Sequence, residues 1–175
     1  DAVVDLSNSP AFDDATAMDF FETAGRNLLA AESRAGVEHH VALSVVGTRK
    51  LTASGYFRAK IRQEDLIQGS GIPYTIIHST QFFEFLPGII KSSADGDAIR
   101  LPTALIQPIA SEEVAESVSR AALQAPVNGI LEIAGPERAP LPAFAERFMH
   151  VVGDTRQVVA DAGTPYFGAM LQEGT

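Results

Sequence analysis

Short β-rich segments alternate with helical ones along the first half of the chain, and this alternation limits the possible folds more than any other feature. Residues 2–6, 40–46 and 73–77 are apolar runs bounded by turn residues, as strands are. Between them, residues 14–35 place apolar side chains at steps of three and four, and residues 56–68 form a second helical segment. Strands separated by helices predict right-handed crossovers and a parallel sheet with helices on both faces. The predicted fold class is therefore α/β.

The pattern is looser after residue 80. The predicted elements there are helices at 81–92, 111–123 and 141–152 and strands at 98–101 and 129–134. The sequence from Gly153 onward predicts little. We interpret residues 1–175 as a single partial domain, in which residues 1–80 form one half of the core. Residues 81–175 then combine further core elements with a small substrate-binding lobe.

Composition argues against several classes of protein. A hydrophobic share of 46% with 20% charged residues is typical of a folded domain, and no apolar run approaches the roughly 20 residues that cross a bilayer. Without cysteine, disulfides and thiolate metal sites are ruled out, and we expect no metal. The 22 acidic residues outnumber the 13 Lys and Arg, which gives a net charge of −9 and disfavours direct contact with nucleic acid. We expect a cytoplasmic protein with no membrane partner.

A dinucleotide-binding fold of the Rossmann type begins with a strand, a G-x-G-x-x-G turn and a helix that holds the pyrophosphate. The one G-x-G of this chain, at residues 69–71, follows a helix and precedes a strand, and the third glycine position holds Tyr74. Each strand-helix-strand unit takes roughly 30 residues, so a missing half would measure roughly 60 to 80 residues. We therefore expect a Rossmann-type doubly wound parallel sheet whose N-terminal glycine-rich half is absent from this chain.

Tyr56 and Lys60 are four residues apart, which places a phenol and an ammonium on one face of the predicted helix. Ser44 comes near the carboxyl end of the preceding strand, where open α/β sheets bind ligands. A free tyrosine has a pKa near 10, and a lysine about 4 Å away supplies on the order of 4 kcal/mol toward lowering it to neutrality. The three side chains are candidates for a catalytic group in which Lys60 tunes Tyr56 and Ser44 holds a carbonyl oxygen.

Several motifs together resemble the atypical short-chain dehydrogenases/reductases, and in particular their NmrA-like group. The motifs occur in the order Val3–Asn8, Leu43–Ser44, Tyr56–Lys60, Ser70–Ile77 with Gln81–Phe83, Pro108–Ala115 and Glu132–Glu137. They cover most of residues 2–153. The order of these motifs is more specific than any one of them.

The resemblance implies an NAD(P) site. Ser7 and Asn8 would lie beside the adenosine or ribose, and Ser44 and Lys60 beside the nicotinamide ribose. Residues 80–82 would lie near the nicotinamide. The cofactor-binding residues predicted in this way are Ser7, Asn8, Ser44, Lys60, Thr80, Gln81 and Phe82. The cofactor would be NAD or NADP, with NADP slightly favoured.

One position departs from the resemblance. The family usually has arginine where this chain has His78, so an anionic contact there would be weakened or replaced. The NmrA-like group also contains members without a working tyrosine, some of which act as regulators, and the presence of Tyr56 favours catalysis.

The function predicted on this basis is an NAD(P)-dependent oxidoreductase that reduces a small carbonyl or quinone-like substrate. Two alternatives stay open: a non-catalytic NAD(P)-binding redox sensor that regulates a partner protein, and a sugar-nucleotide-type epimerase on the same scaffold. A homodimer is a possible assembly.

Other polar groups are expected to be structural. His39 and His40 are neighbours on a strand and point to opposite faces, which prevents them from holding one metal. Glu64–Asp65 and Glu112–Glu113 are predicted to be solvated helix faces rather than acid/base pairs.

Overall fold

Four parallel strands form the sheet that the alternation predicts. The structure, a computed structural model, describes residues 1–166 and 170. The strands are β1 (Ala2–Asp5), β2 (His39–Val45), β3 (Tyr74–Ser79) and β7 (Gly129–Ile133), and they pair in the order β1-β2-β3-β7. The parallel α/β fold expected from the sequence is therefore confirmed.

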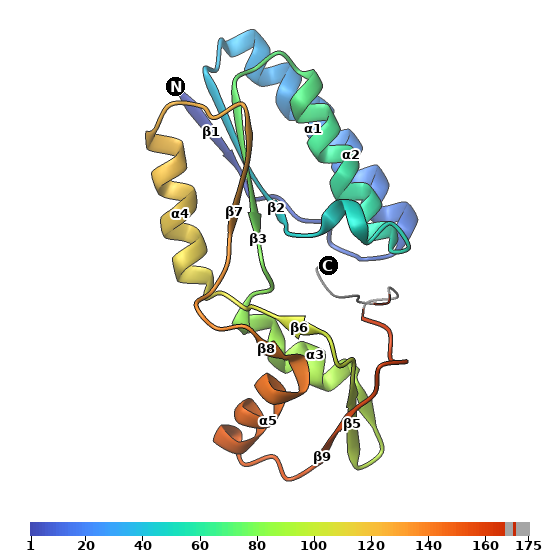
Figure 1. The fold of residues 1–175 in the computed structure, drawn as a ribbon. Helices are drawn as coiled ribbons and strands as arrows, with labels where there is room; N and C mark the ends of the chain where they lie inside the picture. The colour runs from blue at the N-terminus through green and yellow to red at the C-terminus, as the bar shows by residue number, and fades with distance from the viewer. Residues whose placement is uncertain (167–169, 171–175) are drawn as a thin grey trace. The chain divides into compact units, whose positions relative to one another are not determined.

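Helices cover both faces of this sheet (Figure 1). The helices α1 (Asp14–Ala35) and α2 (Gly55–Gly69) pack together on one face, and α4 (Ser111–Leu123) lies on the other. Asp13 caps α1 by accepting a hydrogen bond from the Thr16 N–H at 2.9 Å, and Gly36 ends it in the left-handed region at φ 69°. The short 3-10 turn η1 (Thr48–Lys50) lies between β2 and α2.

The chain forms two compact units. Residues 1–79 and 112–133 form the sheet unit, and residues 80–111 together with the described residues from 134 onward form the second unit. The 81–175 segment, predicted to mix core elements with a lobe, is shared between the two. Apolar side chains from α1, α2, β2 and β3 form the sheet unit's core, among them Phe21, Leu29, Ala42, Ile67 and Ile76.

Small sheets and two helices form the second unit. Its elements are the 3-10 turn η2 (Phe83–Phe85), α3 (Leu86–Ser92), β4 (Ala94–Asp95), β5 (Ala98–Leu101), β6 (Leu105–Ile106), β8 (Ala139–Pro140), α5 (Leu141–Val152) and β9 (Gln157–Ala160). The sheets pair β4-β5-β9 and β6-β8. Ile89, Ile99, Leu101, Leu141 and Phe144 are at the centre of its core.

The helix predicted at residues 81–92 begins later than expected. The Ile109 N–H donates to the Gln81 carbonyl at 2.9 Å, and the Phe83 N–H donates to the Ile109 carbonyl at 3.0 Å. This bridge holds residues 81–82 extended, so η2 starts only at Phe83 and the α-helix at Leu86. A contact distant in sequence therefore overrides the local helical pattern.

Gly135 lies where two segments of the second unit meet. A Cβ atom on this residue would be 1.8 Å from the carbonyl oxygen of Pro108, a distance that real Cβ atoms do not adopt. The Gln107 side chain donates to the Gly135 carbonyl at 2.6 Å. The absence of a side chain at Gly135 therefore lets residues 107–109 and 135 pack backbone to backbone.

Candidate functional site

Lys60 is buried at the carboxyl end of the sheet. Its Nζ donates to the Leu43 carbonyl at 2.9 Å and to Gln63 Oε1 at 2.5 Å, and it lies 4.6 Å from the centre of the Phe21 ring. Burial lowers the pKa of Lys60 to about 8, although the nearby carboxylates of Asp5 and Glu64 favour its charge. The ammonium is thus fixed against the last residues of β2.

A chain of hydrogen bonds continues from Lys60 to the end of β1. Gln63 Nε2 donates to Asp5 Oδ2 at 2.8 Å, and the other oxygen of Asp5 accepts from the Ser7 N–H and hydroxyl at 3.0 and 2.6 Å. Ser7, predicted to lie beside the cofactor, is therefore connected to Lys60 through two side chains that the sequence did not single out. Both of these, Asp5 and Gln63, are buried.

Glu64 is the centre of a second buried cluster. Its Oε1 accepts from Ser44 Oγ at 2.6 Å and is 2.9 Å from His78 Nε2, while Oε2 lies 3.6 Å from Arg49. Ser44 and His78 are register partners on β2 and β3, so the carboxylate bridges two adjacent strands. Burial raises the pKa of Glu64, but the hydrogen bonds from His78 and Ser44 and the charges of His78 and Arg49 outweigh this and lower it.

The expectation that Glu64 is a solvated helix face is wrong. Only 1% of the residue is exposed, whereas the Asp65 side chain next to it is 47% exposed and pairs with Arg49 at 2.7 Å. A signal was present in the spacing, because Tyr56, Lys60 and Glu64 recur every four residues on one face of α2. His78, which stands where the resemblance expects arginine, contacts this internal carboxylate.

Tyr56 contacts the loop after β1. Its hydroxyl donates to Asn8 Oδ1 at 3.1 Å, which joins a predicted catalytic residue to a predicted cofactor-binding one. The Tyr56 ring packs against Phe12, Phe21 and Phe57. Burial raises the pKa of Tyr56 to about 12. The lowering expected from Lys60 is absent because the Lys60 ammonium bonds to Leu43 and Gln63.

The three residues predicted to act together therefore have different partners. Within residues 1–166, Ser44 bonds to Glu64, Tyr56 to Asn8 and Lys60 to Leu43 and Gln63. Tyr56 reaches the loop after β1, Lys60 reaches the Leu43 carbonyl, and Ser44 is the second-last residue of β2. The structure thus gathers them at one edge of the sheet without a hydrogen bond between them.

The remaining predicted cofactor residues, Thr80, Gln81 and Phe82, directly follow β3 and belong to the second unit. Thr80 Oγ1 is buried and makes no hydrogen bond with the described residues. A buried hydroxyl without a partner costs about 1–3 kcal/mol, so its position suits a polar ligand atom. Within the sheet unit, the buried Lys60 ammonium is a group that fits the ribose hydroxyls of a dinucleotide.

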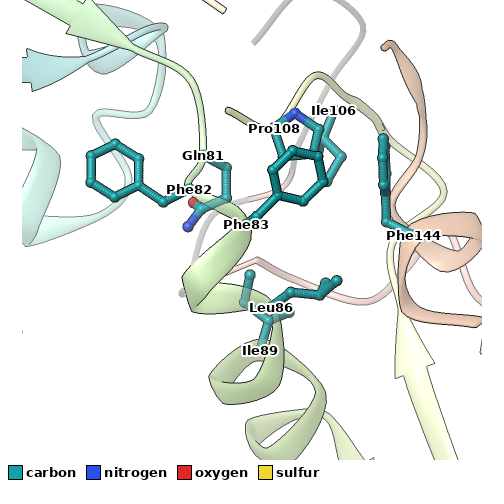
Figure 2. A pocket seen from close by; sticks show the side chains of 8 residues that line it. All are labelled: Gln81, Phe82, Phe83, Leu86, Ile89, Ile106, Pro108 and Phe144. Carbon is teal, nitrogen blue, oxygen red and sulfur yellow. The ribbon is translucent and has the colours of Figure 1, made fainter. Parts of the chain in front are cut away.

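Gln81 and Phe82 also line a pocket of the second unit, shown in Figure 2. The other lining residues are Phe83, Leu86, Ile89, Ile106, Pro108 and Phe144. Seven of these eight side chains are apolar, and the exception is the amide of Gln81. Tyr166 Oη donates to Gln81 Oε1 at 2.5 Å, which leaves the Gln81 NH₂ group as a donor.

The two neighbouring histidines are bonded inside the sheet unit. His40 Nδ1 lies 2.9 and 3.0 Å from the two oxygens of Glu32, and His39 Nε2 lies 2.9 Å from Thr75 Oγ1. Burial, together with the neighbouring His40, lowers the pKa of His39. These contacts agree with the structural role expected for both. In the described part of the chain, no three His, Cys, Asp or Glu side chains gather as metal ligands would.

No protein-family model matches the sequence. The chain is similar to divinyl chlorophyllide a 8-vinyl-reductases named as chloroplastic. The Arabidopsis thaliana protein is 29% identical over 130 residues, which are 68% of this chain and 31% of that protein. The Cucumis sativus protein is 29% identical over 129 residues, or 30% of its length. The chain thus spans about a third of the length of these relatives.

Solved structures resemble the chain over most of its length. A dTDP-glucose 4,6-dehydratase from Streptomyces venezuelae with NAD bound has a TM-score of 0.75 at 16% identity, covering 99% of this chain and 64% of that one. The chain thus has a Rossmann-type fold. An NADPH-dependent quinone oxidoreductase from Escherichia coli has a TM-score of 0.64 at 17% identity, covering 86% of this chain and 58% of that one.

The resemblance that the ordered motifs predict is thus confirmed at the level of the fold. The solved relatives bind NAD or NADPH, so they do not decide between the two cofactors. Over residues 1–166 and 170, no helix is both long and apolar enough to cross a membrane. The chloroplastic name of the relatives gives no support to the expected cytoplasmic location.

Proposed function

We propose that the protein is an NAD(P)-dependent oxidoreductase of the NmrA-like group that reduces a small carbonyl or quinone-like substrate. The observation that carries the proposal is the buried Lys60 ammonium, fixed at the carboxyl end of β2 by Leu43 and Gln63. Parallel α/β sheets bind nucleotides at this edge. An ammonium held there is suited to the ribose hydroxyls of a nicotinamide nucleotide.

The polar residues take separate roles in this proposal. Lys60 and the Ser7–Asn8 turn would hold the dinucleotide, which supplies hydride when bound. Tyr56 would give its proton to the substrate oxygen. Ser44 donates its own hydrogen to Glu64, so toward a ligand it is left with acceptor capacity.

A second candidate is a non-catalytic NAD(P)-binding sensor. Two observations favour it. The Lys60 ammonium bonds to the Leu43 carbonyl and not to the phenol, and the pKa of Tyr56 is raised to about 12. A phenol of this kind is a weak acid at neutral pH. An epimerase on the same scaffold is a third candidate, which rests on the likeness to the dTDP-glucose dehydratase fold.

Several finer features belong to this proposal. NADP is the slightly favoured cofactor, a homodimer is a possible assembly, and the location is expected to be cytoplasmic. The substrate is a small molecule, with no direct contact to nucleic acid or membrane.

Dinucleotide binding by the full-length protein, followed by calorimetry, tests the proposal. Lys60→Met should weaken binding of NADH or NADPH about tenfold or more, because it removes a charged hydrogen-bond donor. Lys91→Met is the matched control, since Lys91 is exposed on α3 and should leave binding unchanged. A wild-type protein that binds neither dinucleotide would overturn the proposal.

Turnover separates the first candidate from the second. Oxidation of NADH or NADPH with a panel of quinones and aldehydes should occur with the wild type and fall sharply in Tyr56→Phe. Cofactor binding without turnover on any of these compounds would support the sensor instead.

A further inference from the structure

Two buried side chains of opposite charge in the sheet unit bond to the same amide. Only 3% of Lys60 and 6% of Asp5 is exposed, and Gln63, which is also 3% exposed, contacts both. Gln63 Oε1 accepts from Lys60 Nζ at 2.5 Å, and Gln63 Nε2 donates to Asp5 Oδ2 at 2.8 Å. A neutral group therefore lies between a buried ammonium and a buried carboxylate.

The partners of this amide fix its orientation. An ammonium can only donate and a carboxylate can only accept, so the oxygen of Gln63 has to face Lys60 and its NH₂ group has to face Asp5. The reversed amide would place donor against donor and acceptor against acceptor. Lys60 and Gln63 are three residues apart on α2, so both lie on the same side of the helix. The amide therefore has one favourable arrangement, and the ammonium has one favourable place beside it.

Asp5 connects this arrangement to the loop after β1. It is the last residue of that strand, and its Oδ1 accepts from the N–H and the hydroxyl of Ser7 at 3.0 and 2.6 Å. The next residue, Asn8, accepts from the Tyr56 hydroxyl at 3.1 Å. Through Asp5, the amide of Gln63 thus links the turn that follows β1 to the helix α2.

Other groups also surround the ammonium. The Leu43 carbonyl of β2 accepts from it at 2.9 Å, and the Phe21 ring of α1 has its centre 4.6 Å away. The carboxylates of Asp5 on β1 and Glu64 on α2 favour its charge, against the effect of burial. Within residues 1–166, the side chain that bonds directly to the ammonium is Gln63.

We propose that Gln63 is a positioning residue, which holds the Lys60 ammonium and the Ser7–Asn8 turn together as one binding element for the dinucleotide. The inference rests on the proposed function, in which Lys60 and this turn bind the cofactor. Gln63 itself acts through Lys60 and Asp5. Lys60 and the turn then contribute to binding jointly rather than independently.

Gln63→Met tests the first link, because methionine has a similar length and lacks the amide's oxygen and NH₂ group. Loss of the acceptor should lower the pKa of Lys60 by about one unit, since a hydrogen bond to the ammonium favours its charged form. Lysine side-chain NMR of the full-length protein without dinucleotide follows this titration, and the Lys60 signal is the one missing from Lys60→Met. Local unfolding would instead move the pKa toward the ordinary value of 10.5.

Gln68→Met is the matched control, because Gln68 is exposed on the same helix. It should leave the titration of Lys60 unchanged. Calorimetry with NADH and NADPH then measures the effect on binding. Gln63→Met should weaken the dinucleotide about tenfold, and Gln68→Met should change it less than twofold.

A double-mutant cycle tests the joint contribution with Gln63 left in place, so it also applies if Gln63→Met does not fold. Ser7→Ala combined with Lys60→Met should weaken dinucleotide binding by clearly less than the product of their separate effects. Ser7→Ala combined with Lys91→Met, at an exposed position on α3, should give the plain product.

Two results would overturn the inference. They are a pKa of Lys60 that is unchanged or raised in Gln63→Met, and a plain product of effects for Ser7→Ala with Lys60→Met. Either result in a protein that binds dinucleotide would keep the proposed function and refute the role of Gln63 alone. A wild type that binds neither dinucleotide would refute the proposed function and this role with it, whatever the titration of Lys60 shows.

Discussion

The two units differ in how many polar side chains they bury. In the sheet unit, the polar side chains at the carboxyl edge are buried and bonded to one another, as Lys60 is to Gln63 and Ser44 to Glu64. In the second unit, the residues around the pocket are apolar except for Gln81, whose Oε1 accepts from Tyr166. The comparison teaches that the first region owes its geometry to internal electrostatics, and the second to the packing of apolar side chains.

The largest expected effect comes from Glu64→Ala. Removing this carboxylate leaves the Ser44 hydroxyl and the His78 ring buried without their partner, which should lower the free energy of unfolding by about 3–5 kcal/mol. Urea denaturation measures the loss. Asp65→Ala is the control, because its exposed pair with Arg49 should contribute about 1 kcal/mol or less. If both variants lost the same free energy of unfolding, buried polar interactions would not be what holds the carboxyl edge of the sheet.

The next effect is a dependence of stability on pH. Lys60 has a pKa of about 8 when folded and an ordinary value of 10.5 when unfolded, so between these values the unfolded chain binds more protons. The lysine's contribution to stability therefore rises as the pH increases from 8 to about 10, by up to about 3 kcal/mol. The stability difference between wild type and Lys60→Met should follow this rise.

Thermal or urea unfolding across that pH range provides the measurement. Tyr56 is present in both proteins, so its own titration at higher pH cancels in the difference. Lys91→Met, at an exposed position, should give a difference that does not vary with pH. A flat difference for Lys60→Met as well would mean that its ammonium is solvated.

The smallest effect concerns the hydrogen bond between Tyr56 and Asn8. Tyr56→Phe should lower the free energy of unfolding by about 1 kcal/mol, because one neutral hydrogen bond is lost and the ring packing stays. In a double-mutant cycle with Asn8→Ala, the two losses should be less than additive. Strict additivity would show that the bond adds nothing to the link between α2 and the β1 loop.

Much of the fold was predictable because local patterns and tertiary contacts agree in most of the chain. Helices α4 and α5 begin and end at the predicted residues, and β5 has the predicted bounds, residues 98–101. The short strand β9, at residues 157–160, was not predicted, because it is defined by its pairing with β5 and has no periodic pattern of its own. Residues 81–82 were misassigned to a helix because their bridge to Ile109 is distant in sequence.

The candidate site was predictable in residue type but less so in orientation. The four-residue spacing correctly places Tyr56 and Lys60 on one helix, and the sequence puts Ser44 near a strand end. It does not reveal that Glu64 takes the Ser44 hydrogen or that Gln63 takes part of the lysine's hydrogen bonding. Such choices depend on which buried groups lack partners after packing, and no single stretch of sequence contains that information.

The close approach of Gly135 to the Pro108 backbone limits which substitutions two stretches of this chain can accept. Two of the motifs on which the sequence resemblance rests, around residues 108–115 and 132–137, meet there with no room for a methyl group. Any larger residue at position 135 would require the backbone around Pro108 to shift, so a substitution in one stretch affects the other. A substitution on one side of this contact therefore has a structural cost on the other side.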